Sequence, residues 1–268
     1  GAYSSSITNP LAQYFTRQGR PFLVFTSADD SITRPGSDWV FRLNQPSFAY
    51  ADVLFQVFNA LNDEHGEDTL RTIALIHGNG AFESAVADAV VELAADQGFE
   101  VIERQEYDQS GADFRPILNR FAARNPDVVF MVSYAVDSVA LMRQIQEVGL
   151  NAKFYAGGAA GFALPGFIEG SGPAADYVFT ATSWTGDVPF EGAVELNEGL
   201  TEILGRVPSY HAAQGYISLI TAVDVLSRAE SFDPADVQQA LLETDLQDNP
   251  YGPINFDDYQ GYRNQNPL

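Results

Sequence analysis

Short apolar runs alternate with amphipathic segments along most of the chain. Six of these runs are rich in β-branched and aromatic residues, which favours strands. They are residues 21–27, 72–78, 99–105, 127–133, 152–158 and 176–183. The runs that are apolar throughout are typical of strands buried on both faces of a parallel sheet. The pattern therefore predicts an α/β fold.

The segments between the runs repeat apolar residues at helical spacing. Residues 81–98 place Phe82 and several other apolar side chains on one helical face, and Gly98 stands where a helix C-terminus is capped. Residues 112–125 and 136–149 show the same pattern. Helices that connect parallel strands in this way form right-handed crossovers.

The alternation stops after Trp184, and three helical segments then follow one another without a strand. They are residues 190–205, 209–229 and 233–244. The middle segment has an apolar side that needs a packing partner, and the opening part of the chain is too small to stand alone. We therefore expect these helices to pack on the opening part.

This organisation predicts two lobes. Residues 1–68 begin the first lobe, residues 69–184 form the second, and residues 185–268 return to the first. The alternative is one continuous doubly wound sheet over residues 21–183 with a helical appendix. That arrangement leaves residues 38–44 and 48–66 without a clear neighbour.

The chain carries 36 acidic and 14 basic residues, for a formal net charge of −22. Binding to nucleic acid or an anionic membrane relies on clustered basic residues, so neither partner is expected. Only Lys153 among the basic residues is a lysine, which is typical of adaptation to salt; an acidic patch for a cationic partner is the alternative. The longest uncharged stretch, residues 154–168, is interrupted by glycine and proline, so no insertion into a membrane is expected.

Catalytic and metal-binding residues are scarce. The chain has no cysteine, and its three histidines lack metal-type spacing. The motif HGNG at residues 77–80 is similar to an oxyanion loop, but no G-x-S-x-G elbow exists and Ser218 lies inside a helical segment. The motif GGAAG at residues 157–161 matches no nucleotide-binding order, which favours a close backbone approach at a cleft or a tight turn. The adjacent Asp257 and Asp258 form no acid–base pair. We expect no enzyme active site, no metal and no cofactor.

The chain opens with GAYSSSITNP, in which Ser4, Ser5 and Ser6 precede the amphipathic residues 11–19. Pro10 suits a first helical turn, so we expect the serines at or just before a helix N-terminus. The N–H groups and the dipole of a helix N-terminus favour an anion such as a ligand carboxylate, and hydroxyls add donors. Plain capping of the helix is the alternative.

The motif TSADDS at residues 26–31 follows the first predicted strand. Ligands of open parallel sheets bind beyond the carboxyl ends of strands, so Ser27, Ala28 and Asp29 are well placed. Asp29 and Asp30 can hold a ligand ammonium or amide. A turn or a helix cap is the alternative for an aspartate in this position.

Several motifs occur together and in order along the whole chain. They are GAYSSSIT, RPFLVFTSA, WVFRLN, GADFRPILNRFAARNPDVVFMVSY, LMRQIQEVGL, GRVPSYHAAQGYISL and YGPINFDDYQGYR. Through them the chain resembles the periplasmic type I solute-binding proteins, and most closely the branched-chain amino acid and amide binding group that serves ABC importers. The resemblance implies two lobes joined by a hinge, each a mostly parallel sheet flanked by helices.

The resemblance also implies the ligand-binding residues. The first serine of the loop and the neighbouring amides hold a ligand carboxylate in this family, which assigns that role to Ser4 with support from Ser5 and Ser6. In this family the loop after the next strand supplies a backbone carbonyl and a hydroxyl to the head group of an amino acid. This places Ala28 and Asp29 in the site, although the family usually has threonine at the second position.

The second lobe contributes aromatic residues that close over the ligand, at Phe82, where tyrosine is usual, and at Tyr134. The acidic residue that pairs with a ligand ammonium falls near Gly158 and is absent. An unpaired ammonium in a closed cleft costs on the order of several kcal/mol. Either Asp29 supplies the counter-charge, or the ligand is not an α-amino acid; the residues favour the second, a carboxylate, amide or aromatic acid.

The resemblance further implies a monomeric protein, periplasmic or extracellular, that captures a small ligand by hinge closure and delivers it to the permease subunits of an ABC transporter. A sensory domain with the same fold and a serine hydrolase are the alternatives. Family members have further βαβ units before the serine loop and strands after residues 252–263. We therefore expect the chain to be a fragment whose exposed sheet edge favours aggregation.

Overall fold

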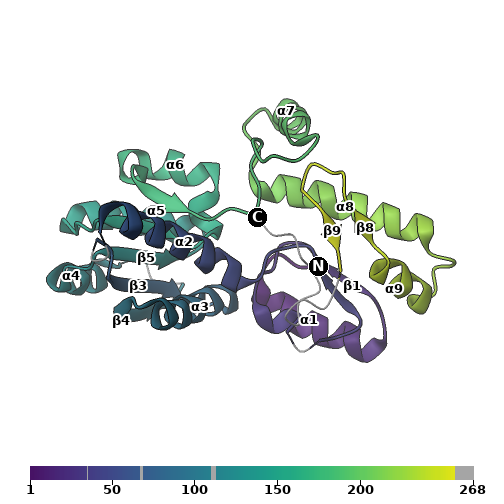
Figure 1. The fold of residues 1–268 in the computed structure, drawn as a ribbon, viewed down its shortest axis with the longest axis horizontal. Coiled ribbons are helices and arrows are strands. Elements are labelled where there is room, and N and C mark those ends of the chain that lie inside the picture. The colour runs from purple at the N-terminus through teal and green to yellow at the C-terminus, as the bar shows by residue number, and fades with distance from the viewer. Residues whose placement is uncertain (35, 67–68, 110–112, 257–268) are drawn as a thin grey trace. The chain divides into compact units, whose positions relative to one another are not determined.

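A computed structural model describes residues 1–34, 36–66, 69–109 and 113–256. The chain divides into two compact units, each with its own helices and strands (Figure 1). Unit 1 contains Gly1–Pro46 and the described residues from Ser183 onward, and unit 2 contains Ser47–Thr182. The adjacent Asp257 and Asp258 lie outside the described residues.

Unit 2 is built on a five-stranded sheet in the order β4-β3-β5-β6-β7. The strands are β3 (Thr72–Gly78), β4 (Glu100–Tyr107), β5 (Val128–Val132), β6 (Phe154–Gly157) and β7 (Val178–Thr180). Every neighbouring pair is parallel. Each strand overlaps a run that the apolar pattern predicted, and the predicted α/β fold with a mostly parallel sheet is confirmed.

Helices flank this sheet. They are α2 (Ser47–His65), α3 (Ala81–Gln97), α4 (Arg115–Arg124), α5 (Ala135–Val148) and α6 (Pro165–Ser171), with the 3-10 helices η2 (Ala160–Ala163) and η3 (Gly172–Ala175). The chain leaves α3, α4 and α5 at Gly98, Asn125 and Gly149, each in the left-handed conformation. These are the capping residues from which the helix ends were predicted.

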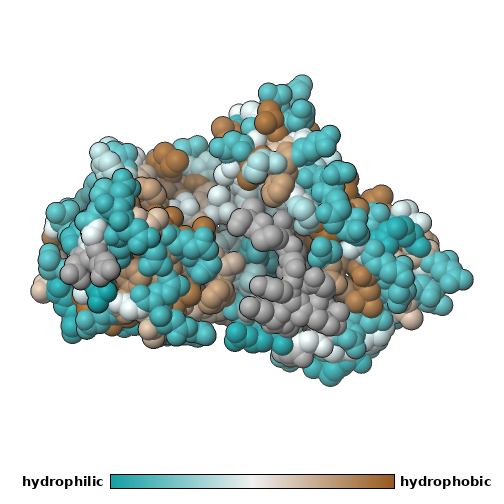
Figure 2. All heavy atoms as spheres, in the orientation of Figure 1, coloured by the Kyte–Doolittle hydropathy of each residue, from teal (hydrophilic) through white to brown (hydrophobic). Residues whose placement is uncertain are grey.

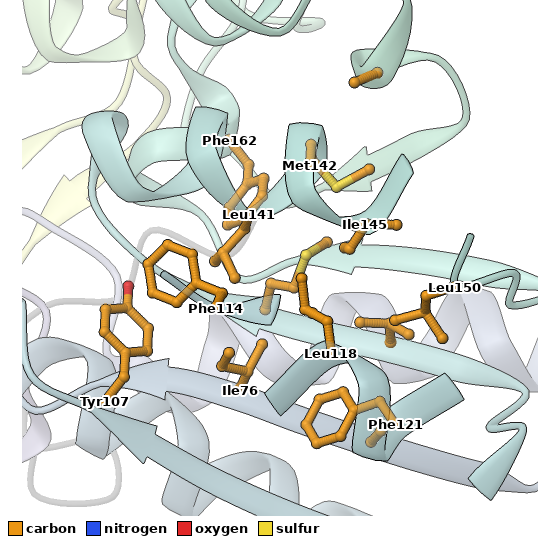
Figure 3. Packing of buried hydrophobic residues seen from close by; sticks show 14 of the residues in the cluster. Ile76, Tyr107, Phe114, Leu118, Phe121, Leu141, Met142, Ile145, Leu150 and Phe162 are labelled. Carbon is orange, nitrogen blue, oxygen red and sulfur yellow. The ribbon is translucent and has the colours of Figure 1, made fainter. Parts of the chain in front are cut away.

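One face of the sheet packs against α4 and α5 (Figure 3). Alternate residues of β3 and β5 contribute to this cluster, together with large side chains around the two helices. The cluster includes Ala74, Ile76, Val129, Met131, Phe114, Leu118, Phe121, Leu141 and Ile145. Full burial of a side chain such as leucine or phenylalanine contributes about 1.5–3 kcal/mol. This layer therefore fixes the strands whose ends carry the candidate site.

α3 packs against β3, β4 and β5, and α2 lies beside α3 and reaches the sheet through Phe58. The ring centroid of Phe58 lies 6.5 Å from that of Phe130 and 5.1 Å from that of Phe154. The sequence analysis grouped residues 1–68 with the first lobe, whereas residues 47–65 pack in unit 2. The difference has a physical reason, because an apolar helix face shows that the helix is buried but not which sheet buries it.

Unit 1 combines residues from before and after unit 2. Its elements are α1 (Ser5–Gln18), β1 (Phe22–Val24), η1 (Asp30–Ile32), β2 (Val40–Arg42), α7 (Ala193–Leu204), α8 (Tyr210–Arg228), α9 (Pro234–Leu242), β8 (Asp245–Leu246) and β9 (Ile254–Asn255). β1 and β2 are parallel, and β8 and β9 are antiparallel. The buried amide of Gln214 donates to Oδ1 of Asn44 at 2.8 Å. This bond joins α8 to the loop after β2, as expected if the later helices pack on the opening part of the chain.

Hydrophilic residues cover much of the face in view in Figure 2. Within the described ranges, no helix is both long enough and apolar enough to cross a membrane.

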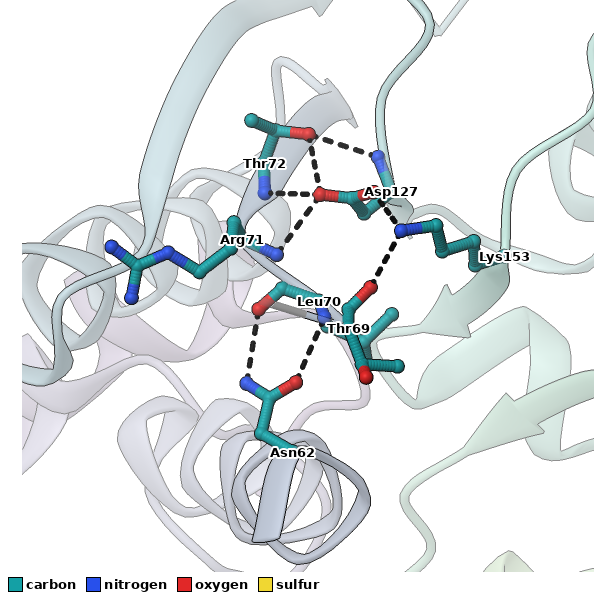
Figure 4. Close-up of polar contacts among 7 residues, drawn as sticks. All are labelled: Asn62, Thr69, Leu70, Arg71, Thr72, Asp127 and Lys153. Atoms are coloured by element: carbon teal, nitrogen blue, oxygen red, sulfur yellow. Dashed lines mark hydrogen bonds and ion pairs between the residues drawn. The ribbon is translucent and has the colours of Figure 1, made fainter. Parts of the chain in front are cut away.

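Asp127 ties together the amino ends of three strands of unit 2 (Figure 4). Its Oδ2 accepts the N–H groups of Arg71 and Thr72, each at 3.0 Å, and the hydroxyl of Thr72 at 2.9 Å. Its Oδ1 lies 2.8 Å from Nζ of Lys153, which also donates to the carbonyl of Thr69. Burial raises the pKa of Asp127, but these hydrogen bonds outweigh burial and hold the pKa below its ordinary value. The carboxylate thus links β3, β5 and β6.

We predict that Asp127→Asn lowers the free energy of unfolding by about 1.5–3 kcal/mol at pH 7, the range for hydrogen bonds to a charged group. Lys153→Met should cost less than about 1 kcal/mol, because the Lys153 side chain is 56% exposed and water screens its ion pair. The pKa of Asp127 is lower in the folded protein than the value of about 3.9 in the unfolded chain. Its ionised form therefore stabilises the fold at a pH above about 3.9, and this stabilisation is lost as the pH falls through the folded pKa.

Urea unfolding between pH 7 and the acid range measures these effects. Asp113→Asn is the matched control, since Asp113 makes its ion pair with Arg115 at the surface. Equal destabilisation by the two aspartate variants, or a difference from wild type that does not shrink in acid, would contradict this role of Asp127.

Candidate functional site

The residues assigned to ligand binding fall into two groups, one in each unit. In unit 1 they surround the N-terminus of α1 and the loop after β1: Ser4, Ser5, Ser6, Ser27, Ala28 and Asp29. In unit 2 they follow the carboxyl ends of β3, β5 and β6: Phe82, Tyr134 and Gly158. Each group lies where a parallel sheet places its ligand-binding loops.

Ser4 is the N-cap residue of α1. Its backbone is extended, with φ −81° and ψ 138°, and its carbonyl accepts the N–H groups of Ile7 at 3.1 Å and Thr8 at 2.9 Å. The Ser4 hydroxyl makes no capping bond to the helix, although an N-cap serine commonly does. The hydroxyl lies at the N-terminus of α1, the positive end of the helix dipole.

Pro10 lies inside α1 and not in its first turn. The prediction about Pro10 was wrong in this respect, because the helix already begins at Ser5. A proline in a helix interior lacks the N–H that would bond to the carbonyl four residues earlier, that of Ser6. The predicted position of the serines at a helix N-terminus is nevertheless confirmed.

The hydroxyl of Ser27 holds the segment that leads into α1. It lies 3.0 Å from the carbonyl oxygen of Tyr3, 3.1 Å from that of Ala2 and 2.6 Å from Oγ1 of Thr8. Ser27 and Thr8 are both buried. Buried hydrogen bonds of this kind contribute about 0.5–1.5 kcal/mol each. Ser27 thus positions the serine loop, and its contact with a ligand remains a prediction.

Asp29 caps η1. Its Oδ1 accepts the N–H of Ser31 at 2.9 Å, its Oδ2 accepts Nδ2 of Asn9 at 2.6 Å, and its own N–H donates to Oγ of Ser5 at 3.3 Å. Both carboxylate oxygens are therefore bonded within unit 1. This is the capping role that the sequence left open as the alternative to ligand binding.

Arg42 was missed by the sequence analysis. Its side chain is fully buried, and Nη1 donates to the carbonyls of Ala28 at 2.8 Å and Asp29 at 3.1 Å. The Ala28 carbonyl, which was assigned to a ligand head group, thus serves an internal bond. The available sequence signal for burial was the position of Arg42 between two apolar residues in WVFRLN. A buried arginine needs several hydrogen-bond acceptors, which the loop after β1 supplies here.

Phe82 and Tyr134 form an aromatic pair in unit 2. Their ring centroids are 5.9 Å apart with an interplanar angle of 39°. The Tyr50 ring also packs against Phe82, with its centroid at 6.4 Å and its plane nearly perpendicular. Phe82 is buried and Tyr134 is partly exposed. The structure therefore brings together the two aromatic residues that were assigned to the ligand.

The loop after β6 is packed closely against its neighbours. A Cβ added to Gly158 would lie 3.0 Å from Val132 and 3.2 Å from Phe130, and one on Gly161 would lie 2.5 Å from the carbonyl carbon of Tyr134. Gly158 thus faces the core, and a carboxylate side chain has no room there. The predicted close backbone packing of GGAAG is confirmed.

The catalytic alternatives find no support in the geometry. His77 is buried, its Nδ1 lies 2.8 Å from the carbonyl oxygen of Gly78, and its Nε2 accepts Nε of Arg104 at 3.0 Å. Burial lowers the pKa of His77. The Ser218 hydroxyl lies 2.6 Å from the carbonyl of Gln214, one turn earlier in α8. Across the described part of the chain, no three acidic or histidine side chains gather in a way that could hold a metal.

Comparison with known proteins identifies relatives along the whole chain. The profile of a family described as periplasmic binding protein matches residues 1–266. Leu/Ile/Val-binding protein homolog 7 of Brucella melitensis biotype 1 is 24% identical over 254 residues, which cover 92% of this chain and 64% of that protein. The chain therefore spans somewhat less than two thirds of the length of this curated relative.

Solved structures share the fold. A leucine binding protein of Thermotoga maritima MSB8 has a TM-score of 0.86 at 18% identity, covering 98% of this chain and 73% of that one. A second structure is a solute binding protein of an ABC transporter from Rhodopseudomonas palustris BisB5, in complex with 3,4-dihydroxy benzoic acid. It has a TM-score of 0.76 at 20% identity, and the match covers 95% of this chain and 68% of that one.

The packing of the loop after β6 generates a prediction. Gly161→Ala should lower the free energy of unfolding by about 1–3 kcal/mol, the usual cost of forcing a methyl group into a packed site. Gly166→Ala in α6 is the control, because its Cβ would meet nothing within 4 Å. Chemical denaturation of both variants measures the difference. Equal stability would show that the loop does not lie against Tyr134.

Proposed function

Since the chain belongs to the periplasmic binding protein family, we propose that it captures a small solute outside the cytoplasm and presents it to the permease subunits of an ABC importer. It works as a monomeric binding protein and not as an enzyme. The two lobes close on the ligand by a hinge motion, and the permease recognises the closed form. The ligand carries a carboxylate, amide or amino-acid-like group.

The N-terminus of α1 is the observation that carries this proposal. A helix N-terminus attracts an anion through its N–H groups and its dipole. The Ser4 hydroxyl stands at that terminus without a capping bond, and the Ser27 hydroxyl fixes the segment before it. An anion bound there needs no rearrangement of the loop, so little binding free energy is lost to ordering.

The ligands named for two relatives support a carboxylate as the bound anion. One relative is a leucine binding protein, and the other was solved with 3,4-dihydroxy benzoic acid. Leucine and 3,4-dihydroxybenzoic acid differ in size, in charge and in aromatic character, but both carry a carboxylate. We therefore infer that this chain also binds a carboxylate, and that other residues of the site select among acids.

Phe82 and Tyr134 supply contacts for the remainder of the ligand. Two aromatic rings at this spacing offer an apolar surface for an aliphatic or aromatic group. Hinge closure needs contacts that exist in the closed form alone, and a partly exposed Tyr134 can make such contacts. The aromatic pair thus complements the carboxylate site of unit 1.

We predict that Ser4→Ala weakens the binding of acids about tenfold, the effect of losing one hydrogen bond to a charged group. The free energy of unfolding should change by less than about 0.5 kcal/mol, since the hydroxyl makes no capping bond. Isothermal titration calorimetry with L-leucine, 4-methyl-2-oxopentanoate and 3,4-dihydroxybenzoate measures the affinities.

Ser227→Ala is the control, because the exposed Ser227 hydroxyl bonds to the carbonyl of Asp224 near the end of α8. It should leave every affinity unchanged. If wild-type protein binds none of the three acids, the proposed function is wrong. If Ser4→Ala binds them as tightly as wild type, the carboxylate site lies elsewhere.

A further inference from the structure

His211 is a partly buried titratable residue of unit 1 that the proposed function does not use. It is the second residue of α8, and its ring packs on that of Tyr210, with centroids 4.0 Å apart and an interplanar angle of 32°. The Tyr3 ring also packs on His211, with centroids 5.1 Å apart and an angle of 56°. Tyr3 directly precedes Ser4. The three rings therefore connect α8 to the residue before the candidate carboxylate site.

His211 is an uncharged ring at neutral pH. Burial lowers its pKa to about 4. A protonated histidine near a carboxylate site would act as a counter-ion, whereas a neutral one offers a flat ring for packing. Tyr3 is 49% exposed, and a side chain so exposed keeps several rotamers unless a neighbouring group restrains it. The ring of His211 is such a neighbour.

The backbone of Tyr3 is held separately, by the loop after β1. Its carbonyl oxygen accepts the hydroxyl of Ser27 at 3.0 Å and that of Thr26 at 3.2 Å. Bonds to a single oxygen fix one point of the residue, and the ring contact with His211 fixes a second. The peptide group that joins Tyr3 to Ser4 is planar. The orientation of Tyr3 therefore determines how the chain enters α1.

The start of α8 is a fixed platform for the His211 ring. Gln214 lies three residues after His211, so the two side chains share a face of the helix. The Gln214 side chain is buried, and its Nε2 donates to Oδ1 of Asn44 at 2.8 Å and to Oγ of Ser183 at 3.3 Å. Tyr210 is buried as well. The first turn of α8 is thus anchored in unit 1, and His211 is anchored with it.

We propose that His211 is a positioning residue for ligand binding: by packing on Tyr3, it holds the serine loop, residues 4–6, in the orientation in which the N-terminus of α1 receives the ligand carboxylate. The inference rests on the proposed function and adds a residue to it. His211 acts through Tyr3 and not by contact with the ligand. A site whose donors are already in place loses little affinity to ordering, so loss of the ring should weaken every carboxylate ligand alike.

The first test measures affinity after the ring is removed or replaced. Isothermal titration calorimetry is carried out with L-leucine, 4-methyl-2-oxopentanoate and 3,4-dihydroxybenzoate on wild-type protein, His211→Ala, His211→Phe and His65→Ala. We expect His211→Ala to weaken all three acids equally, by about tenfold. His211→Phe restores a ring and should bind within about threefold of wild type. His65 is the control, because its side chain is 55% exposed at the end of α2, and its removal should change no affinity.

The second test examines the loop without ligand. Hydrogen–deuterium exchange in peptides that contain residues 2–6 should be faster in His211→Ala than in wild-type protein or His211→Phe. Tyr3→Ala removes the other ring of the contact, in case His211→Ala does not fold. We expect it to show the same faster exchange and the same equal loss of affinity, while thermal melts report on folding.

The inference is overturned if His211→Ala exchanges and binds as wild type does. A loss of affinity that differs among the three acids would also overturn it, since His211 would then contact the ligand itself. So would a His211→Phe variant that binds as weakly as His211→Ala. These outcomes leave the proposed function intact. Failure of wild-type protein to bind any of the three acids contradicts the proposed function, and this inference falls with it.

Discussion

The loops at the ends of parallel strands have backbone groups without partners in the sheet, and buried polar side chains supply several of those partners. In unit 1, the Ser27 hydroxyl holds the segment before α1, and Arg42 bonds to the carbonyls of the loop after β1. In unit 2, the Glu83 carboxyl group fills the space between two glycines of the loop after β3. The positions of all candidate ligand contacts depend on how these loops are held.

The amino and carboxyl ends of the strands in unit 2 differ in structure. At the amino ends, both carboxylate oxygens of Asp127 are bonded to residues at the starts of neighbouring strands. At the carboxyl edge, Ala159 and Ala160 have positive φ angles of 61° and 47°. Such conformations cost about 1–3 kcal/mol each and persist where the surroundings impose them, often at functional sites. This pair lies at the same end of the strands as Phe82 and Tyr134, although Asn125 and Tyr177, which precede β5 and β7, also have positive φ angles of 50° and 63°.

Much of this fold could be predicted from periodicity and capping residues. The strands of unit 2 and the ends of three of its helices followed from local pattern, because a strand buried on both faces and a left-handed glycine each leave a local signature. The partner of α2 did not follow, since an apolar helix face does not identify the sheet that covers it.

The candidate site was predicted less completely. The serines at the start of α1 were found because a helix N-terminus has a sequence signature. Arg42 was missed, because the apolar residues that flank it in WVFRLN are the one local signal of its burial. Asp29 was found as a candidate, but only coordinates reveal that its two oxygens are bonded to Asn9 and Ser31. Burial of polar groups is thus the information that the sequence does not contain.

The central claim is that the N-terminus of α1 binds the carboxylate of the ligand. Hydrogen–deuterium exchange tests it most directly, with and without a saturating amount of whichever of the three acids binds most tightly. Slower exchange is expected in peptides that contain residues 4–6, because a carboxylate bound at this helix N-terminus orders and shields its N–H groups. Unchanged exchange in those peptides, while calorimetry detects binding, would contradict it.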